Sequence, residues 1–207
     1  TPNLAFYECY GMDGMRALDA TVDYIRSKYP EIFLIADAKR GDIGNTAKMY
    51  AKAFFEEMDF DAVTIAPYMG ADSVTPFLEY KDKWAIVLAL TSNASAYQFQ
   101  NAQKDGKPLY QAVMEEMMEI STPDNMMFVV GATKADKLQE LRSFCPDNFF
   151  LVPGVGAQGG SAEEVIANGS NDHGGLLINS SRGILFADST ENYAKVAGEV
   201  AAKTANL

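Results

Sequence analysis

The sequence predicts an α/β fold built around a parallel sheet, and three observations support this. Short apolar runs rich in Val, Ile, Leu and Phe recur along the 207 residues. These runs are almost continuously apolar, which is typical of strands buried on both faces. Segments with the apolar spacing of helices separate the runs, and this strict alternation favours right-handed crossovers between parallel strands.

The strands are predicted from the apolar runs in chain order. Residues 3–8 are typical of the end of a strand, and six further runs follow. They lie at residues 33–36, 62–65, 85–88, 127–130, 149–152 and 176–178.

Helices are predicted between the strands. In the second of them, Ala47, Tyr50, Ala51 and Phe54 recur at spacings of three and four, which places them on one helix face. Prolines mark helix ends, as Pro30 does after the first helix. The seven expected helices span residues 12–28, 45–57, 72–80, 108–120, 134–144, 161–168 and 189–204.

Seven strands and seven helices are one βα unit short of a (β/α)8 TIM barrel. We therefore expect residues 1–207 to form a single barrel domain that lacks its first βα unit, which would precede Thr1. Seven strands also permit an open doubly wound sheet. Residues 94–108 are the only long irregular stretch predicted, and they are a candidate for a loop over an active site.

Composition and charge exclude several function classes. The chain has 17 Lys and Arg against 28 Asp and Glu, a net charge of −11, so it lacks the positive surface that nucleic acids and anionic membranes attract. Cys9 and Cys145 are too few for a disulfide framework, which fits a reducing cytoplasm. The single histidine, His173, excludes a multi-His metal site. No apolar stretch of about 18 residues predicts a membrane span.

Charged residues cluster after the strand at 33–36. Asp37 and Lys39 are two residues apart, so a regular strand would place their side chains on one face, and Asp42 follows near the next helix. Opposite charges at the C-terminal rim of a barrel create a strong local field. The alternative is a structural salt bridge with Asp42 as a helix N-cap. Three charges at the end of an apolar strand are costly to place there without a function, which favours a catalytic site.

A glycine-rich segment, residues 153–161, follows the strand at 149–152 and precedes a helix. Glycine backbone and a helix N-terminus suit an anion. The segment lacks the Lys of a P-loop, and its G-x-G-x-x-G spacing lacks the acidic residue of a dinucleotide site. Arg182, after the last strand, suits a phosphate, although it is alternatively a surface ion-pair residue. Since phosphate sites of such barrels lie after strands 7 and 8, the two features support each other.

The strand at 85–88 is followed by the polar residues Thr91, Ser92 and Asn93. Their hydroxyl and amide groups are able to hydrogen-bond the edge of a base-like ligand. They are equally able to cap the polar loop that follows.

Taken together, these residues resemble the orotidine 5′-phosphate decarboxylase family, specifically its longer bacterial-type subgroup. Residues 37–46 carry that family's D-x-K-x-x-D-I signature, and the likeness extends to residues 66–70, 153–160 and 179–183 in the same order. The resemblance implies a (β/α)8 barrel that works as a homodimer. It implies conversion of orotidine 5′-monophosphate (OMP) to uridine 5′-monophosphate (UMP) and CO2 in pyrimidine biosynthesis, with no cofactor or metal.

The resemblance also implies roles for individual residues. Asp37 would face the substrate carboxylate, and Lys39 would protonate the ring carbon. Asp42 would cross the dimer interface into the partner's site, with Ile43 and Thr46 beside it. The other expected substrate contacts are Gln158, Gly159, Arg182 and Gly183 at the phosphate, and Ser92 and Asn93 at the pyrimidine edge.

One position departs from the family pattern. The family's Lys-Pro-Asn is Thr1-Pro2-Asn3 here, so Thr1 stands where the first Lys of the charged array is expected. We therefore expect this chain alone to be nearly inactive, because loss of one preorganised donor costs about 10²–10³-fold in rate.

Two alternatives stay open. One is a Mg-dependent sugar-phosphate decarboxylase or aldolase, which shares the barrel and a similar D-x-K-x-x-D. Such enzymes need further carboxylates at neighbouring strand ends, whereas the next strand here ends in Ala66-Pro67-Tyr68. The other is an inactive nucleotide-binding fragment that keeps only the phosphate site.

Overall fold

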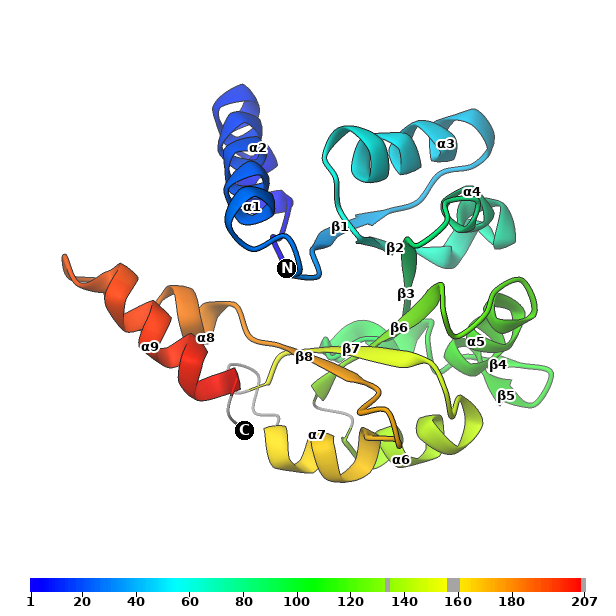
Figure 1. The fold of residues 1–207 in the computed structure, drawn as a ribbon. Helices are drawn as coiled ribbons and strands as arrows, with labels where there is room; N and C mark the ends of the chain where they lie inside the picture. Colours follow the sequence, from blue (N-terminus) through cyan, green and yellow to red (C-terminus); the bar gives the residue numbers. More distant parts are fainter. Residues whose placement is uncertain (133–134, 156–160, 206–207) are drawn as a thin grey trace. The chain divides into compact units, whose positions relative to one another are not determined.

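Six strands form the main sheet in a computed structural model, which describes residues 1–132, 135–155 and 161–205. The strands are hydrogen-bonded in the order β1-β2-β3-β6-β7-β8 (Figure 1). The pairs β1–β2, β2–β3 and β7–β8 are parallel, which confirms the expected α/β class with parallel strands. The bounds are β1 Ile35–Arg40, β2 Ala62–Ile65, β3 Trp84–Leu90, β6 Met126–Val130, β7 Phe149–Pro153 and β8 Leu176–Asn179.

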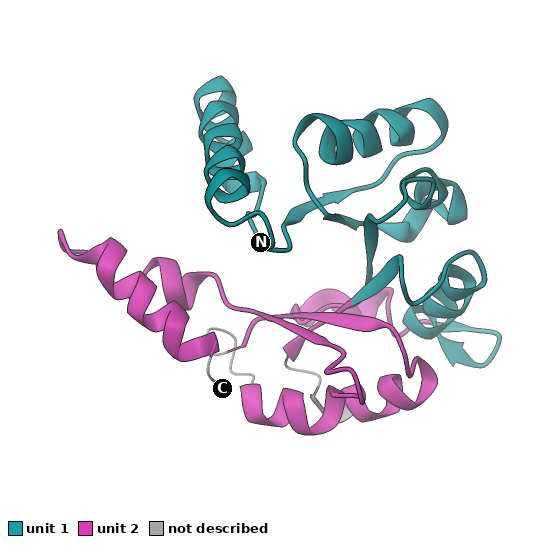
Figure 2. Ribbon diagram, viewed as in Figure 1, with its two compact units in different colours: residues 1–89, 103–128 teal, residues 90–102, 129–207 magenta. Residues whose placement is uncertain are grey.

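The chain divides into two compact units (Figure 2). Unit 1 comprises Thr1–Ala89 and Gln103–Phe128, and unit 2 comprises Leu90–Ala102 and Val129–Leu207. Strands β2 and β6 are buried at every residue, as their uniformly apolar sequences predict.

Unit 1 has an apolar core between its strands and helices. Ala47 and Ala51 of α3 are fully buried, and Phe54 and Phe60 meet edge to face at 6.3 Å between ring centroids. Such an aromatic pair adds to the stability gained from burial alone. The helices and the small hairpin of unit 1 are α1 Ala5–Glu8, α2 Gly11–Lys28, α3 Gly44–Lys52, the π-helix η1 Ala53–Glu57, η2 Pro67–Met69, η3 Ala71–Ser73, α4 Thr75–Leu78, β4 Gln103–Lys104, β5 Lys107–Pro108 and α5 Leu109–Glu119.

In unit 2, the guanidinium of Arg142 links the segment after α6 (Ala135–Phe144) to the residues that precede β8. Its nitrogens donate to the carbonyl oxygens of five residues at 2.7–3.1 Å, and the group lies 4.1 Å from the ring centroid of Phe150. Burial lowers the pKa of Arg142. The five acceptors are Cys145, Pro146, Asn148, Gly169 and Gly175. The helices of unit 2 are η4 Ala94–Gln98, α6 Ala135–Phe144, α7 Ala162–Gly169, α8 Arg182–Leu185 and α9 Tyr193–Ala205.

Four predictions about individual elements were wrong. Within residues 3–8, Asn3 pairs in parallel with Asp37, but the chain then turns into α1. The main sheet therefore contains six strands among the described residues, not seven. The helix expected at 72–80 is divided into η3 and α4, because Pro76 lacks the N–H that would continue the first segment. Residues 94–108 contain η4 and the β4–β5 hairpin and are not irregular throughout.

No helix within the described ranges is both long and apolar enough to cross a membrane.

Candidate active site

Strand β1 is interrupted by a bulge just before its end. Ala36 pairs with Val63 and Arg40 pairs with Ile65, so four steps along β1 oppose two steps along β2. Within the bulge, Lys39 has a φ of +49°, a conformation that is uncommon for a residue with a side chain. The alternation of a regular strand therefore does not apply between Asp37 and Lys39.

Asp37 and Lys39 nevertheless meet. Lys39 Nζ forms an ion pair with Asp37 Oδ1, and Asn3 Nδ2 donates to Asp37 Oδ2 at 2.8 Å. The Asp37 side chain is 15% exposed, whereas that of Lys39 is 50% exposed. The carboxylate is thus largely enclosed by protein partners, and the ammonium group remains accessible to a ligand.

The hydroxyl of Thr64, on β2, lies against the bulge. Thr64 Oγ1 accepts from the backbone N–H groups of Ala38 at 3.0 Å and Lys39 at 2.9 Å, and it lies 3.2 Å from Asp37 Oδ1. This residue was not predicted as part of the site. The available signal was a single hydroxyl within the apolar run at 62–65, beside the strand that carries the charges.

Asp42 and its neighbours lie after the bulge. Asp42 Oδ1 accepts from the backbone N–H of Ile43 at 2.8 Å, and Ile43 itself occupies the N-cap position of α3. The alternative role of Asp42 as the helix N-cap was therefore wrong. Ile43 is 49% exposed, and Thr46 is also exposed. These three residues lie within five positions of one another and adjoin the bulge in sequence.

The signature also contains Arg40, which already has partners. It forms an ion pair with Glu8, donates to the Ala38 carbonyl at 2.8 Å, and lies over the rings of Tyr50 and Phe54 at 5.6 and 5.7 Å. Arg40 thus ties the bulge to α1 and α3.

In unit 2, a polar cluster follows β3. The side-chain amide of Gln100 exchanges two hydrogen bonds of 2.8 Å with the backbone N–H and the hydroxyl of Thr91. Thr91 also donates to Asn93 Oδ1 at 2.5 Å. A Cβ on Gly131 would lie 2.7 Å from Ser92 N, so glycine permits this close approach. Ser92 therefore lies close against Gly131. Asn93 is hydrogen-bonded to Thr91 and Ser95.

The two predicted phosphate-binding segments of unit 2 begin side by side. Pro153, the last residue of β7, is in register with Asn179, the last residue of β8. Both following segments therefore leave the same edge of the sheet. Arg182 begins α8 and is exposed, as is Gly183. Gln158 and Gly159 lie outside the described residues.

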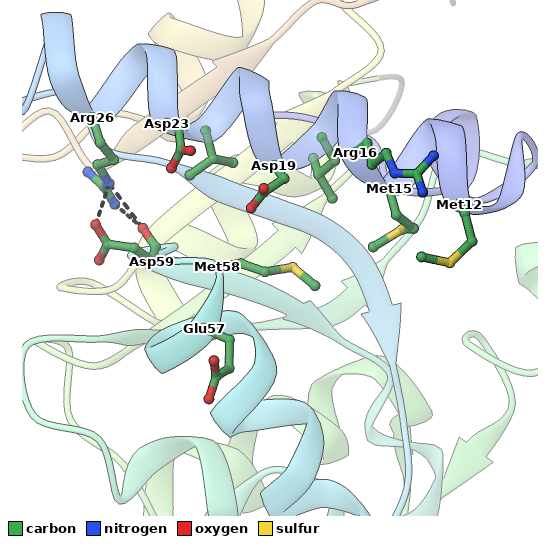
Figure 3. Close-up of a pocket in the computed structure, with 11 residues that line it drawn as sticks. Met12, Met15, Arg16, Asp19, Asp23, Arg26, Glu57, Met58 and Asp59 are labelled. Atoms are coloured by element: carbon green, nitrogen blue, oxygen red, sulfur yellow. Dashed lines mark hydrogen bonds and ion pairs between the residues drawn. The ribbon is translucent and has the colours of Figure 1, made fainter.

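A cavity of about 330 Å³ lies elsewhere in unit 1, between α2 and η1 (Figure 3). Met12, Met15 and Met58 contribute to its apolar lining, and Arg26 forms an ion pair with Asp59 at its edge. Its lining contains none of the predicted site residues. Across the described ranges, no group of three or more His, Cys, Asp and Glu residues is placed to hold a metal ion.

Comparison with known proteins identifies relatives over nearly the whole chain. A family model described as "Orotidine 5'-phosphate decarboxylase / HUMPS family" matches residues 2–197. The orotidine 5′-phosphate decarboxylase of Christiangramia forsetii is 56% identical over 197 residues, which are 95% of this chain and 72% of that protein. The one from Phocaeicola vulgatus is 55% identical, over 98% of this chain and 75% of that protein. Among solved structures, the OMP decarboxylase of Leishmania donovani is similar with a TM-score of 0.83 at 36% identity, over 96% of this chain and 76% of that one.

Proposed function

This chain belongs to the orotidine 5′-phosphate decarboxylase family, and we propose which of its residues bind the substrate and which carry out the decarboxylation. The reaction is the carboxy-lyase step that converts OMP to UMP and CO2 in pyrimidine biosynthesis. The observation that carries the residue assignments is the contact between Asp37 and Lys39 in the bulge within β1.

Asp37 and Lys39 are the proposed catalytic residues. The bond between the pyrimidine ring and the carboxylate breaks, CO2 leaves, and the electron pair remains on the ring carbon. Lys39 stabilises this carbanion through its positive charge and then donates a proton from Nζ to the carbon. Asp37 faces the substrate carboxylate and disfavours the ground state through like charge. Such preorganised charges act more strongly on the transition state than on the substrate.

Substrate binding is assigned to the loops of unit 2. Arg182 and Gly183, together with Gln158 and Gly159, bind the phosphate, and Ser92 and Asn93 contact the pyrimidine edge. The support is that β7 and β8 end in register and that Arg182 is exposed. Arginine matches the geometry of a phosphate with paired donors.

A homodimer is the proposed assembly, with Asp42 entering the partner's site and Ile43 and Thr46 beside it. The support is that Ile43, at the N-cap of α3 and next to Asp42, presents an apolar side chain that is 49% exposed. The proposal also includes a barrel of the (β/α)8 type as a single domain, acting in the cytoplasm without a metal or cofactor. The similarity to a solved decarboxylase with a TM-score of 0.83 supports the barrel.

The test is an assay of OMP consumption with the chain and its Lys39→Ala variant. We expect Lys39→Ala to lower kcat by about 1,000-fold, because it removes both the stabilising charge and the proton donor. Lys81→Ala, which removes an exposed lysine paired only loosely with Asp82 at 4.0 Å, is the matched control and is expected to keep the parent rate. A Lys39→Ala variant within about tenfold of the parent would refute the assigned role.

A further inference from the structure

Thr64 is a hydroxyl-bearing residue in the most deeply buried strand of unit 1. It is 1% exposed, and its neighbours in β2, Ala62, Val63 and Ile65, are fully buried and apolar. A polar group at such a position is costly unless it is hydrogen-bonded. Its partners therefore indicate why a hydroxyl is present.

The hydrogen bonds of Thr64 use its whole capacity. A hydroxyl accepts two hydrogen bonds and donates one. Thr64 Oγ1 accepts from Ala38 N and Lys39 N at 3.0 and 2.9 Å. Its single proton is available to Asp37 Oδ1 at 3.2 Å or to the Ala36 carbonyl at 3.5 Å. All of these partners belong to the bulge or to the residue before it.

We propose that Thr64 is a positioning residue for decarboxylation, because it fixes the bulge that presents Asp37 and Lys39 to the substrate. This inference rests on the catalytic roles proposed above for those two residues. Thr64 does not touch the substrate. It compensates the N–H groups that leave the β1–β2 ladder where four steps along β1 oppose two along β2, and so it stabilises the left-handed backbone of Lys39, with its φ of +49°.

Two substitutions separate the hydroxyl from the shape of the side chain. Thr64→Val keeps the volume but leaves two partly buried N–H groups without their acceptor, which is unfavourable. Thr64→Ser keeps the oxygen and loses only a methyl group. If the hydroxyl positions the site, kcat is expected to fall in Thr64→Val and to stay close to the parent value in Thr64→Ser.

The kinetic test compares kcat and KM for OMP in the parent, Thr64→Val and Thr64→Ser. Misplacement of reacting groups by about 1 Å costs on the order of 100-fold in rate. We expect Thr64→Val to lower kcat by about this factor with KM little changed, since the phosphate-binding residues are untouched. We expect Thr64→Ser to stay close to the parent. A folded Thr64→Val variant with the parent kcat, or a Thr64→Ser variant as slow as Thr64→Val, would overturn the proposal.

Ser73→Ala is the matched control. Ser73 is also buried in unit 1, and its hydroxyl donates to the Gly70 carbonyl at 2.7 Å, away from the bulge. Its loss is expected to lower thermal stability without changing kcat. An equal fall of kcat in Ser73→Ala would show that the loss of any buried hydroxyl slows the enzyme, which would contradict a specific role for Thr64.

A second measurement does not depend on turnover. Hydrogen exchange by NMR reports directly on the backbone N–H groups of Ala38 and Lys39. We expect both to be protected in the parent and in Thr64→Ser, and to exchange faster in Thr64→Val. Unchanged protection in Thr64→Val would refute positioning by the hydroxyl. Protection that changes as expected, together with full activity of Lys39→Ala, would instead place the failure in the proposed catalytic roles.

Discussion

The bulge within β1 and the turn after β8 hold their charged groups in different ways. In the bulge, Asp37 is bound by Asn3, Lys39 and Thr64, and even the backbone N–H groups have a side-chain acceptor. In the turn, Arg182 is exposed at the start of a four-residue helix. In the bulge the carboxylate of Asp37 is enclosed by protein partners, whereas the turn has only an exposed cation, Arg182.

This difference matches what the two regions are proposed to do. Groups that act on a breaking bond gain most from being fixed before the substrate arrives, because reorganisation during the reaction raises the barrier. A group that binds a phosphate remote from the reacting carbon is free to become ordered by the ligand. The ordering is then part of binding.

The largest effect is expected from a charge added beside the bulge. Thr1→Lys restores the Lys-Pro-Asn pattern at the segment whose Pro2 carbonyl accepts from the Asp37 backbone N–H at 3.0 Å. We expect kcat for OMP to rise by about 10²–10³-fold. Thr1→Gln, which matches much of the length without the charge, is the control. Equal rates in Thr1→Lys and the parent would contradict the expectation that the chain as it stands is nearly inactive.

The next largest effect is expected in the turn after β8. Arg182→Ala is expected to raise KM for OMP by about 10- to 100-fold, because a hydrogen bond to a charged group contributes about 1.5–3 kcal/mol. The thermal unfolding temperature is expected to stay unchanged, since the side chain is exposed. Arg182→Lys keeps the charge and should recover part of the affinity. A marked loss of stability in Arg182→Ala would mean that the turn is ordered by the protein after all.

The smallest effect is a pH dependence at a third place, beside Arg142. Burial raises the pKa of the fully buried Cys145 thiol to about 11. In the unfolded chain the thiol ionises near its ordinary pKa, so it stabilises the fold below about pH 9. This contribution is lost as the pH rises towards 11.

We expect the free energy of unfolding to fall by about 1–2 kcal/mol across that interval in the parent, and to fall less in Cys145→Ala. The measurement is urea unfolding at pH 8, 9, 10 and 11. An identical decline in both proteins would assign the alkaline loss to groups other than Cys145.

The strands were predictable because each contains an almost continuous run of apolar residues. Helices such as α3 were predictable because their apolar residues recur at regular helical spacing. Short elements were not. Four-residue helices such as α1 and α8 contain a single turn and show no period. The β4–β5 hairpin did have a signal, the Asp105-Gly106 dipeptide, whose two positive φ angles of +54° and +84° are those of a type I′ turn.

The site was predictable in its residues more than in its geometry. The contact between Asp37 and Lys39 was expected from strand alternation, yet it arises in a bulge where alternation fails. No local pattern marks a bulge of this kind in the printed sequence. Thr64 was overlooked because its neighbours indicate only a buried strand, and its partners lie 25–28 positions away in the chain.

The bulge has a consequence for how such a protein changes over evolutionary time. Pairing with β2 stops at Ala36 and resumes at Arg40, so the β1–β2 ladder places no demand on the side chains in between. We therefore expect substitutions there to alter reactivity while leaving the register of β1 with β2 intact. Related proteins are therefore able to acquire different activities through substitutions in the bulge while keeping the same sheet.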